Sequence, residues 1–312
     1  MLNRRILRIK AFKELYSYAE NPSMTLKEAE AELSRSCEAT RDLYLYMMAL
    51  IGPLTKEASD RIESRRNKFN PTEEERNPNM RFVQNGVAAA LAADVDFVKL
   101  LSRKKLSWDQ NDAFLRRLYE TVSSREYFQE YMKSEKSGLR EDVDLFVKIF
   151  EQELVDNEDL EVILEDMSIY WNDDLAYALT QCCRSLEAMA KGAPWEFPPL
   201  YQSDIIKKTN PAVESDLEFV TKLLRCAFAG YQRYFDMVAG AVPKWDKDRL
   251  FSTDVVLIIA GLAEAENFKT IPNKVTVNEY VEISKFYGTP KSRSFVNGLL
   301  DKLIKDNLSL SI

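Results

Sequence analysis

The sequence predicts an all-α protein, and three observations support this fold class. Apolar residues recur at intervals of three or four over most of the chain, which is the spacing of residues along one face of a helix. No partner segments with the alternating pattern of paired strands are evident. Of the 312 residues, 46 % are hydrophobic, which is enough for one large core or two smaller ones. We therefore expect a helical bundle.

The helices are expected in the following order. The first carries arginines in its first turn, from Arg4 onward. A long helix is expected over 214–240, because apolar residues there recur at helical spacing: Val213, Leu217, Val220, Leu224, Ala227, Phe228, Tyr231, Phe235 and Val238. Two more are expected, one around 277–287 and a last one that starts at Thr289-Pro290. Proline suits the first turn of a helix, where its missing N–H costs no hydrogen bond.

The run from Asp254 to Glu264 is ambiguous by itself. Its β-branched residues suit a buried strand, whereas Ser252, Thr253 and Asp254 offer a helix N-cap. A lone strand would leave its backbone groups unpaired, since no partner strand is evident. We therefore expect a buried central helix over 252–266.

Proline and asparagine mark two breaks in the chain. One lies at 70–79, and the other runs from Gly192 to Pro211, where four prolines suggest a semi-rigid linker. We expect three segments. These are the N-terminal helices (1–80), an additional helical region with the linker (81–210), and a C-terminal helical domain (211–312).

Charge is distributed unevenly, although the net charge is only −7. Residues 1–13 hold five cations and no acid, and residues 269–306 hold seven cations and four acids. Residues 141–175 hold thirteen acids against one lysine. A basic partner for this acidic block is one interpretation, and a solvated face is the more ordinary one.

Several classes of site are excluded by composition. The chain has no histidine, which removes the usual general base and the commonest zinc ligand. Its four cysteines form no Cys-x-x-Cys pair, and no two of its nine glycines lie closer than ten residues, so no Gly-rich phosphate or dinucleotide loop is present. We expect no metal or cofactor. No apolar run is long enough for a membrane span and no signal peptide is evident, so a cytoplasmic location is expected.

Two separated parts of the chain resemble the NusB family of antitermination factors. The more specific part is Phe295-Val-Asn-Gly-Leu-Leu-Asp-Lys302, which follows Val277-Asn-Glu-Tyr-Val-Glu-Ile-Ser-Lys285. The other is Arg4-Arg5-x-x-Arg8, followed by Leu15-Tyr16, which resembles the family's arginine-rich first helix. The length, with about 150 residues between the two parts, resembles enlarged members from the Bacteroides group. The resemblance implies a NusB-type helical bundle with a large helical insertion.

The family binds single-stranded box-A RNA, and the resemblance places RNA contacts at both parts. Arginines in a first helical turn meet the positive end of the helix dipole, so Arg4, Arg5 and Arg8 are locally unfavourable unless an anion lies near. The loop 287–295 combines cations for phosphates with aromatic rings that stack on bases. The expected RNA-binding residues are Arg4, Arg5, Arg8, Tyr16, Tyr287, Lys291, Arg293 and Phe295. Core packing remains an alternative for Tyr16 and Phe295.

The resemblance also implies a protein partner, the basic ribosomal protein NusE, which docks on helices of the C-terminal half, here within 214–266. An RNA polymerase antitermination complex is a further implied partner. Glu264 matches an acidic family position and is expected to form a structural ion pair. Asn278 and Glu279 are expected to cap a helix. Gly298 is expected at a close helix crossing.

Three functions are weighed. The first is a non-enzymatic RNA-binding antitermination factor in ribosomal RNA transcription. The second is a helical protein–protein adaptor that has kept the fold and lost RNA binding, which the acidic block motivates. The third is an enzyme, because NusB-like domains also precede some RNA cytosine methyltransferases. Such an enzyme needs a separate nucleotide-binding domain with a Gly-rich loop, and this chain has neither.

Overall fold

The computed structural model describes residues 3–195, 215–242 and 253–307, and within these ranges every regular element is helical. The fold class predicted from the sequence is therefore confirmed. The chain forms two compact units. Unit 1 combines the first residues, 1–38, with the last, 199–312, and unit 2 is the intervening part, 39–198. No helix of the described residues has the length and apolar character that a membrane crossing requires.

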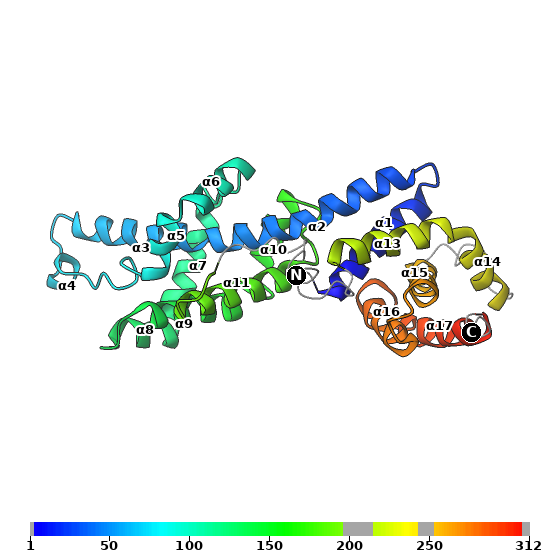
Figure 1. Cartoon of the computed structure of the whole chain (residues 1–312). Helices are drawn as coiled ribbons and strands as arrows, with labels where there is room; N and C mark the ends of the chain where they lie inside the picture. The colour runs from blue at the N-terminus through cyan, green and yellow to red at the C-terminus, as the bar shows by residue number, and fades with distance from the viewer. Residues whose placement is uncertain (1–2, 196–214, 243–252, 308–312) are drawn as a thin grey trace. The chain divides into compact units, whose positions relative to one another are not determined.

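Unit 1 is built around one almost completely buried helix, α15 (Thr253–Asn267). Five helices surround α15, and four of them follow one another in the last third of the chain. They are α1 (Arg4–Glu20), α13 (Asp216–Ala229), α14 (Tyr231–Ala241), α16 (Asn273–Tyr287) and α17 (Ser292–Asn307). Figure 1 shows α1 beside helices that follow it by more than 200 residues. The prediction of a buried central helix is confirmed, because the residues from Val255 to Ala265 are all buried.

Three local expectations about unit 1 are wrong. The expected helix over 214–240 is two helices, since α13 ends at Ala229 and α14 begins at Tyr231. A Cβ on Gly230, between them, would lie 2.4 Å from the Tyr234 ring. Glu279 caps no helix, since α16 already begins at Asn273, after Pro272. Gly298 has open space around it, whereas a Cβ on Gly261 would lie 2.9 Å from Leu300 Cδ2. The close helix crossing is therefore at Gly261, between α15 and α17.

Unit 2 is a second helical assembly with its own core. Its helices are α3 (Ile51–Arg66), α4 (Glu73–Arg76), α5 (Gly86–Ala93), α6 (Val95–Lys104), α7 (Asp112–Ser124), α8 (Glu126–Lys133), α9 (Leu139–Ile149), the π-helical turn η1 (Phe150–Leu154), α10 (Glu158–Met167) and α11 (Leu175–Ala190). Helix α2 (Leu26–Ala49) contributes residues to both units. Tyr46 stacks on Trp108 with ring centroids 4.2 Å apart, and the Trp108 indole N–H donates to the Tyr46 carbonyl.

This division differs from the three segments expected from the sequence. The structure separates the units at 38/39 and 198/199, and the Pro-Asn stretch at 70–79 lies inside unit 2. The reason is that α3, which precedes this stretch, packs on α5 and α7, which follow it. Most of the expected linker, residues 196–211, lies outside the described residues.

Candidate nucleic-acid interface

The arginines of α1 occupy three different environments. Helix α1 begins at Arg4, after Asn3, whose side chain accepts the backbone N–H of Arg5 at 2.9 Å. The Arg8 side chain is only 4 % exposed, and its Nε and Nη2 donate to the two oxygens of Glu264 at 2.7 and 2.8 Å. Arg8 therefore points into unit 1 and is not available to an external phosphate. The expected structural pairing of Glu264 is confirmed, and the expectation that Arg8 faces RNA is corrected.

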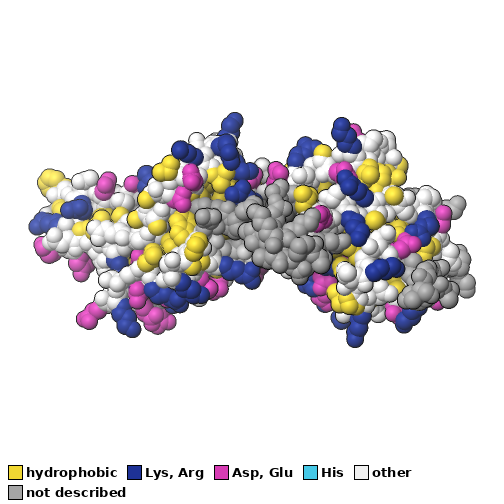
Figure 2. Space-filling model, viewed as in Figure 1, with side chains coloured by type: hydrophobic (Ala, Val, Ile, Leu, Met, Phe, Trp, Pro, Cys, Tyr) yellow, Lys and Arg dark blue, Asp and Glu magenta, His cyan; other side chains and the backbone are white. Residues whose placement is uncertain are grey.

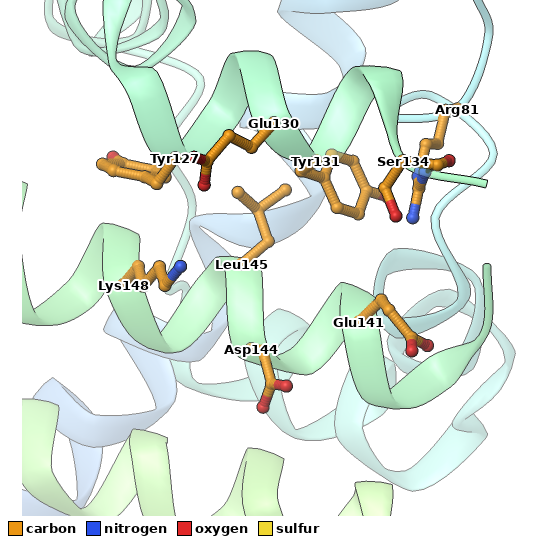
Figure 3. A pocket seen from close by; sticks show the side chains of 9 residues that line it. All are labelled: Arg81, Tyr127, Glu130, Tyr131, Ser134, Glu141, Asp144, Leu145 and Lys148. Atoms are coloured by element: carbon orange, nitrogen blue, oxygen red, sulfur yellow. Dashed lines mark hydrogen bonds between the residues drawn. The ribbon is translucent and has the colours of Figure 1, made fainter. Parts of the chain in front are cut away.

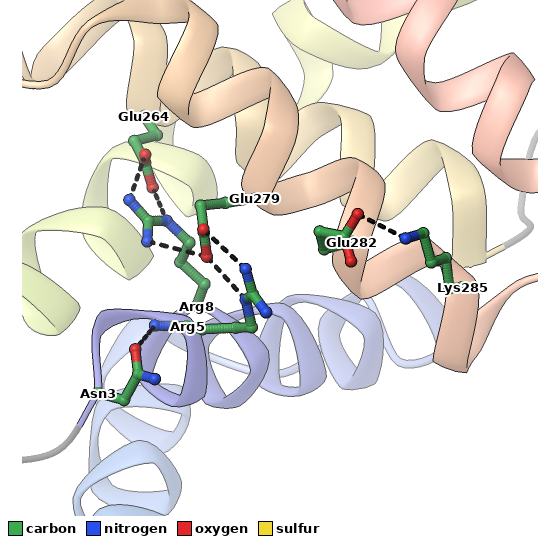
Figure 4. A network of polar contacts seen from close by, with 7 residues as sticks. All are labelled: Asn3, Arg5, Arg8, Glu264, Glu279, Glu282 and Lys285. Atoms are coloured by element: carbon green, nitrogen blue, oxygen red, sulfur yellow. Dashed lines mark hydrogen bonds and ion pairs between the residues drawn. The ribbon is translucent and has the colours of Figure 1, made fainter.

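Arg5 lies nearer the surface. Its Nε and Nη2 donate to the two oxygens of Glu279, both at 2.9 Å, and 41 % of its side chain is exposed. The hydrogen bonds from Arg5 hold the pKa of Glu279 below its ordinary value, against the opposing effect of burial. Figure 4 shows Arg5 and Arg8 reaching from α1 to the carboxylates of α16 and α15. These two bidentate pairs fix the position of α1 on the bundle.

Arg4 is directed to another helix of unit 1. Its guanidinium carbon lies 4.1 Å from the ring centroid of Phe219 on α13, and Arg8 approaches the same ring at 5.4 Å. This arrangement is a cation–π contact. Arg4 is partly exposed, so it retains some access to solvent.

The end of α16 packs against α1 through aromatic rings. Phe12 lies 5.3 Å from Tyr287 and 6.3 Å from Tyr16 between ring centroids, and Lys13 Nζ lies 5.8 Å from the Tyr287 centroid. Tyr16, Tyr287 and Phe295 are all partly buried against the core of unit 1. Each ring thus packs partly against the core, as the alternative expected for Tyr16 and Phe295, and each keeps an exposed part.

The two cationic segments meet beside one carboxylate, Glu282 of α16. Lys285 donates to Glu282 and is the main cause of its lowered pKa, to which the charges of Arg5 and Arg293 also contribute. Arg5 belongs to α1 and Arg293 to α17. The contacts of Phe12 and Lys13 with Tyr287 place α1 against the first residue of the loop 287–295. Lys291 and Arg293 are both exposed. We call this surface, formed by Arg5, Lys13, Lys285, Phe286, Tyr287, Lys291 and Arg293, the cationic edge.

The sequence reasoning missed three residues of the cationic edge, Lys13, Lys285 and Phe286. Lys13 lies over Tyr287, and Phe286 is 78 % exposed. The signal for Phe286 was its spacing of four and seven residues from Glu282 and Glu279, which places all three on one helical face. In Figure 2, cationic and acidic side chains are interspersed over the visible face of the molecule. Nucleic-acid binding would therefore depend on local geometry and not on a broad field.

Unit 2 contains a cleft of about 200 Å³ between α8 and α9 (Figure 3). Arg81 lies over the ring of Tyr131 at 4.2 Å, and the Tyr131 hydroxyl donates to the buried Asp142 at 2.7 Å. The Tyr127 hydroxyl donates to Glu153 in the same way, at 3.1 Å. Burial raises the pKa of both phenols, so they remain neutral donors at pH 7. The groups with perturbed pKa values in this cleft thus have structural partners.

Comparisons with known proteins find relatives of the C-terminal part of the chain. The NusB family model matches residues 178–305, from within α11 to the last turn of α17. A "Transcription antitermination protein NusB" from Methylacidiphilum infernorum (isolate V4) is 36 % identical over 113 residues, which span 36 % of this chain and 71 % of the relative. The protein of the same name from Bacillus thuringiensis (strain Al Hakam) is 33 % identical over 118 residues, 35 % of this chain and 90 % of the relative. No solved structure gave a significant match.

The family match includes α15 and four of the five helices that surround it, α13, α14, α16 and α17. Helix α1 precedes the match, yet it packs into the same core and carries the arginines. Unit 2 separates α1 from the rest of unit 1 along the chain. With its similarity to these relatives and its all-helical core, the chain belongs to the NusB family.

Proposed function

We propose that this protein is a non-enzymatic, RNA-binding transcription antitermination factor of the cytoplasm. It would bind box-A-like single-stranded RNA together with the ribosomal protein NusE, within an RNA polymerase antitermination complex that acts on ribosomal RNA. The observation that carries the proposal is the meeting of α1 and the loop 287–295 at the cationic edge. The names of the curated relatives support the antitermination role.

The cationic edge has the chemistry that single-stranded RNA requires. Exposed cations bind phosphates, and aromatic rings stack on bases that are not paired. Lys291 and Arg293 are the exposed cations of the loop, and Arg5 of α1 is 41 % exposed. Tyr16, Tyr287 and Phe295 supply partly exposed rings. Arg8 has a positioning role, because its pair with Glu264 holds α1 where Arg4 and Arg5 can contribute.

The NusE dock is proposed on α13 and α14. The expected range, 214–266, also includes α15, but α15 is buried along most of its length and offers little surface. Leu217 on α13 is 37 % exposed, and several polar residues of α13 and α14 face solvent. These two helices therefore provide the accessible part of the expected range.

The test is binding of the full chain to a labelled box-A-like RNA, with and without NusE. The double variant Lys291→Ala/Arg293→Ala should weaken binding. It should also reduce the slope of log K against log salt by about 0.7 for each phosphate that the variant no longer binds. The matched control is Lys99→Ala/Arg103→Ala, which removes two exposed cations from α6 of unit 2. Equal affinities for both double variants and the unchanged protein would refute the site.

A second candidate function, a protein–protein adaptor, is favoured by the surface of α10. This helix buries only Leu160 and Leu164, whereas Val162, on its opposite side, is 59 % exposed. Glu158, Glu161, and Glu165 surround Val162, and no ion pair to them is found in the described part of the chain. Unit 2 as a whole has 21 Lys and Arg against 30 Asp and Glu, a net charge of −9.

An acidic helix with an exposed apolar residue complements a basic partner that also carries apolar side chains. We propose that a basic protein segment binds the exposed face of α10. NusE serves as the test protein for this binding. The variant Glu161→Gln/Glu165→Gln should weaken NusE binding in the absence of RNA and lower its salt dependence. The control Glu73→Gln/Glu74→Gln removes two exposed acids from α4. If both variants bind NusE equally well, α10 does not bind this basic protein.

A further inference from the structure

Phe286 differs from the other aromatic residues of the cationic edge. It lies in the last turn of α16 and is 78 % exposed. Tyr287, the next residue, packs on Phe12, and its backbone carbonyl accepts a hydrogen bond from Thr253 at 3.1 Å. Tyr16 and Phe295 are partly buried against the core. Phe286 therefore offers an open ring where its neighbours already have packing partners.

The surroundings of Phe286 are cationic and come from three helices. Phe286 follows Glu282 by four residues, so the two side chains are neighbours on the surface of α16. Lys285, Arg5 and Arg293 all act on Glu282. Because Lys285 pairs with Glu282 and Arg5 pairs with Glu279, the acids on this face are already compensated. The ring is thus exposed beside cations of α1, α16 and α17.

A single exposed apolar side chain is ordinary on a protein surface, so what points to a ligand is the combination of an open ring with nearby cations. Stacking on a nucleobase uses the whole face of the ring, while nearby cations bind the phosphates on either side of that base. We propose that Phe286 forms a base-stacking subsite for one unpaired nucleobase, with Lys285 and Arg293 beside the adjoining phosphates. This inference rests on the proposed RNA-binding function and adds a base contact to it.

The subsite has two consequences for recognition. Every base has a flat face, so stacking on Phe286 tolerates different bases. It should therefore strengthen binding and lengthen the stretch of RNA that is covered, without setting the sequence. The ring carries no charge, so its removal should leave the salt dependence of binding unchanged.

The experiment compares Phe286→Ala, Phe286→Leu and Phe286→Trp in the full chain, by titration with a labelled box-A-like RNA. Both Phe286→Ala and Phe286→Leu should weaken binding by about 5- to 150-fold, the range for removal of one stacked base. Phe286→Trp should bind as tightly as the unchanged protein or more tightly. The matched control is Phe69→Ala, since Phe69 is a fully exposed phenylalanine of unit 2. All variants should keep the melting temperature, because the side chain is exposed.

An abasic scan of the RNA identifies the stacked base. At one position, removal of the base should weaken binding to the unchanged protein and have no further effect on Phe286→Ala. If the unchanged protein binds no RNA, the proposed function itself fails. If the protein binds RNA and Phe286→Ala binds equally well, only the subsite is refuted. Unchanged RNA binding by Phe286→Leu would also refute stacking, and a weakening of NusE binding alone would assign Phe286 to a protein contact.

Discussion

The buried pair of Arg8 and Glu264 gives the most decisive prediction for the fold of unit 1. Glu264 is fully buried and accepts two hydrogen bonds from Arg8 and one from Thr276, at 2.8 Å. In Arg8→Ala the carboxylate stays buried and loses its compensating charge. Breaking a buried pair in this way costs about 3–5 kcal/mol. Arg5→Ala removes a pair at a half-exposed site and should cost about 1 kcal/mol or less.

The assay is urea and thermal unfolding followed by circular dichroism, together with hydrogen exchange of the peptides from α1 and α15. For a unit of roughly 150 residues, a destabilisation of about 3–5 kcal/mol lowers the melting temperature by about 6–20 °C. Faster exchange in Arg8→Ala should be confined to unit 1. The double variant Arg8→Met/Glu264→Leu should recover much of the stability, because it leaves no buried charge. Equal destabilisation by Arg8→Ala and Arg5→Ala would show that the buried pair has no special role.

Two further predictions concern stability. Burial, and then the charge of Glu32, raise the pKa of Glu14 to about 7, while Lys10, Arg35 and Lys13 lower it. Since the folded pKa is above the unfolded one, Glu14 favours folding less as pH rises from about 4.5 to about 7. Glu14→Gln should therefore stabilise the protein by about 1–3 kcal/mol at pH 8 and have little effect at pH 4, measured by urea unfolding at both values. Gly261→Ala should destabilise by about 1–3 kcal/mol, because its Cβ would meet Leu300, whereas Gly298→Ala should stabilise by about 0.5–1 kcal/mol, because it has open space within a helix. Similar melting temperatures for these two variants would contradict the packing described around α15.

The sequence predicted which segments are helical better than it predicted which side chains contact one another. The buried helix α15 could be recognised because a lone strand has no way to satisfy its backbone. The arginines of α1 follow one another within five residues, yet Arg8 is buried and Arg5 is half exposed. Which arginine turns inward depends on where Glu264 and Glu279 lie in space, and both are more than 250 residues away along the chain.

Tertiary contacts also decide where the helices cross closely and what role Glu279 has. Asn297-Gly298 looked like a helix crossing because both residues are poor helix formers, but the crossing lies at Gly261 in an apolar run. Glu279 looked like a capping residue because a helical run follows it, but its partner is Arg5. The cationic edge was predicted in outline, since loop cations and aromatic residues are visible in the sequence. Helical spacing places Phe286 on the same face as Glu279 and Glu282. Only the packing of Tyr287 on Phe12, however, shows which of the two adjacent rings is open.

The division of unit 1 along the chain has a consequence for synthesis. Arg8 and Glu264 are separated by 256 residues. At about 5–20 residues per second, a ribosome adds Glu264 some 13–50 s after Arg8. During that time the residues of unit 2, which form a core of their own, are synthesised between the two parts of unit 1. The carboxylates that Arg5 and Arg8 bind in the folded protein are therefore among the last parts of the chain to be synthesised.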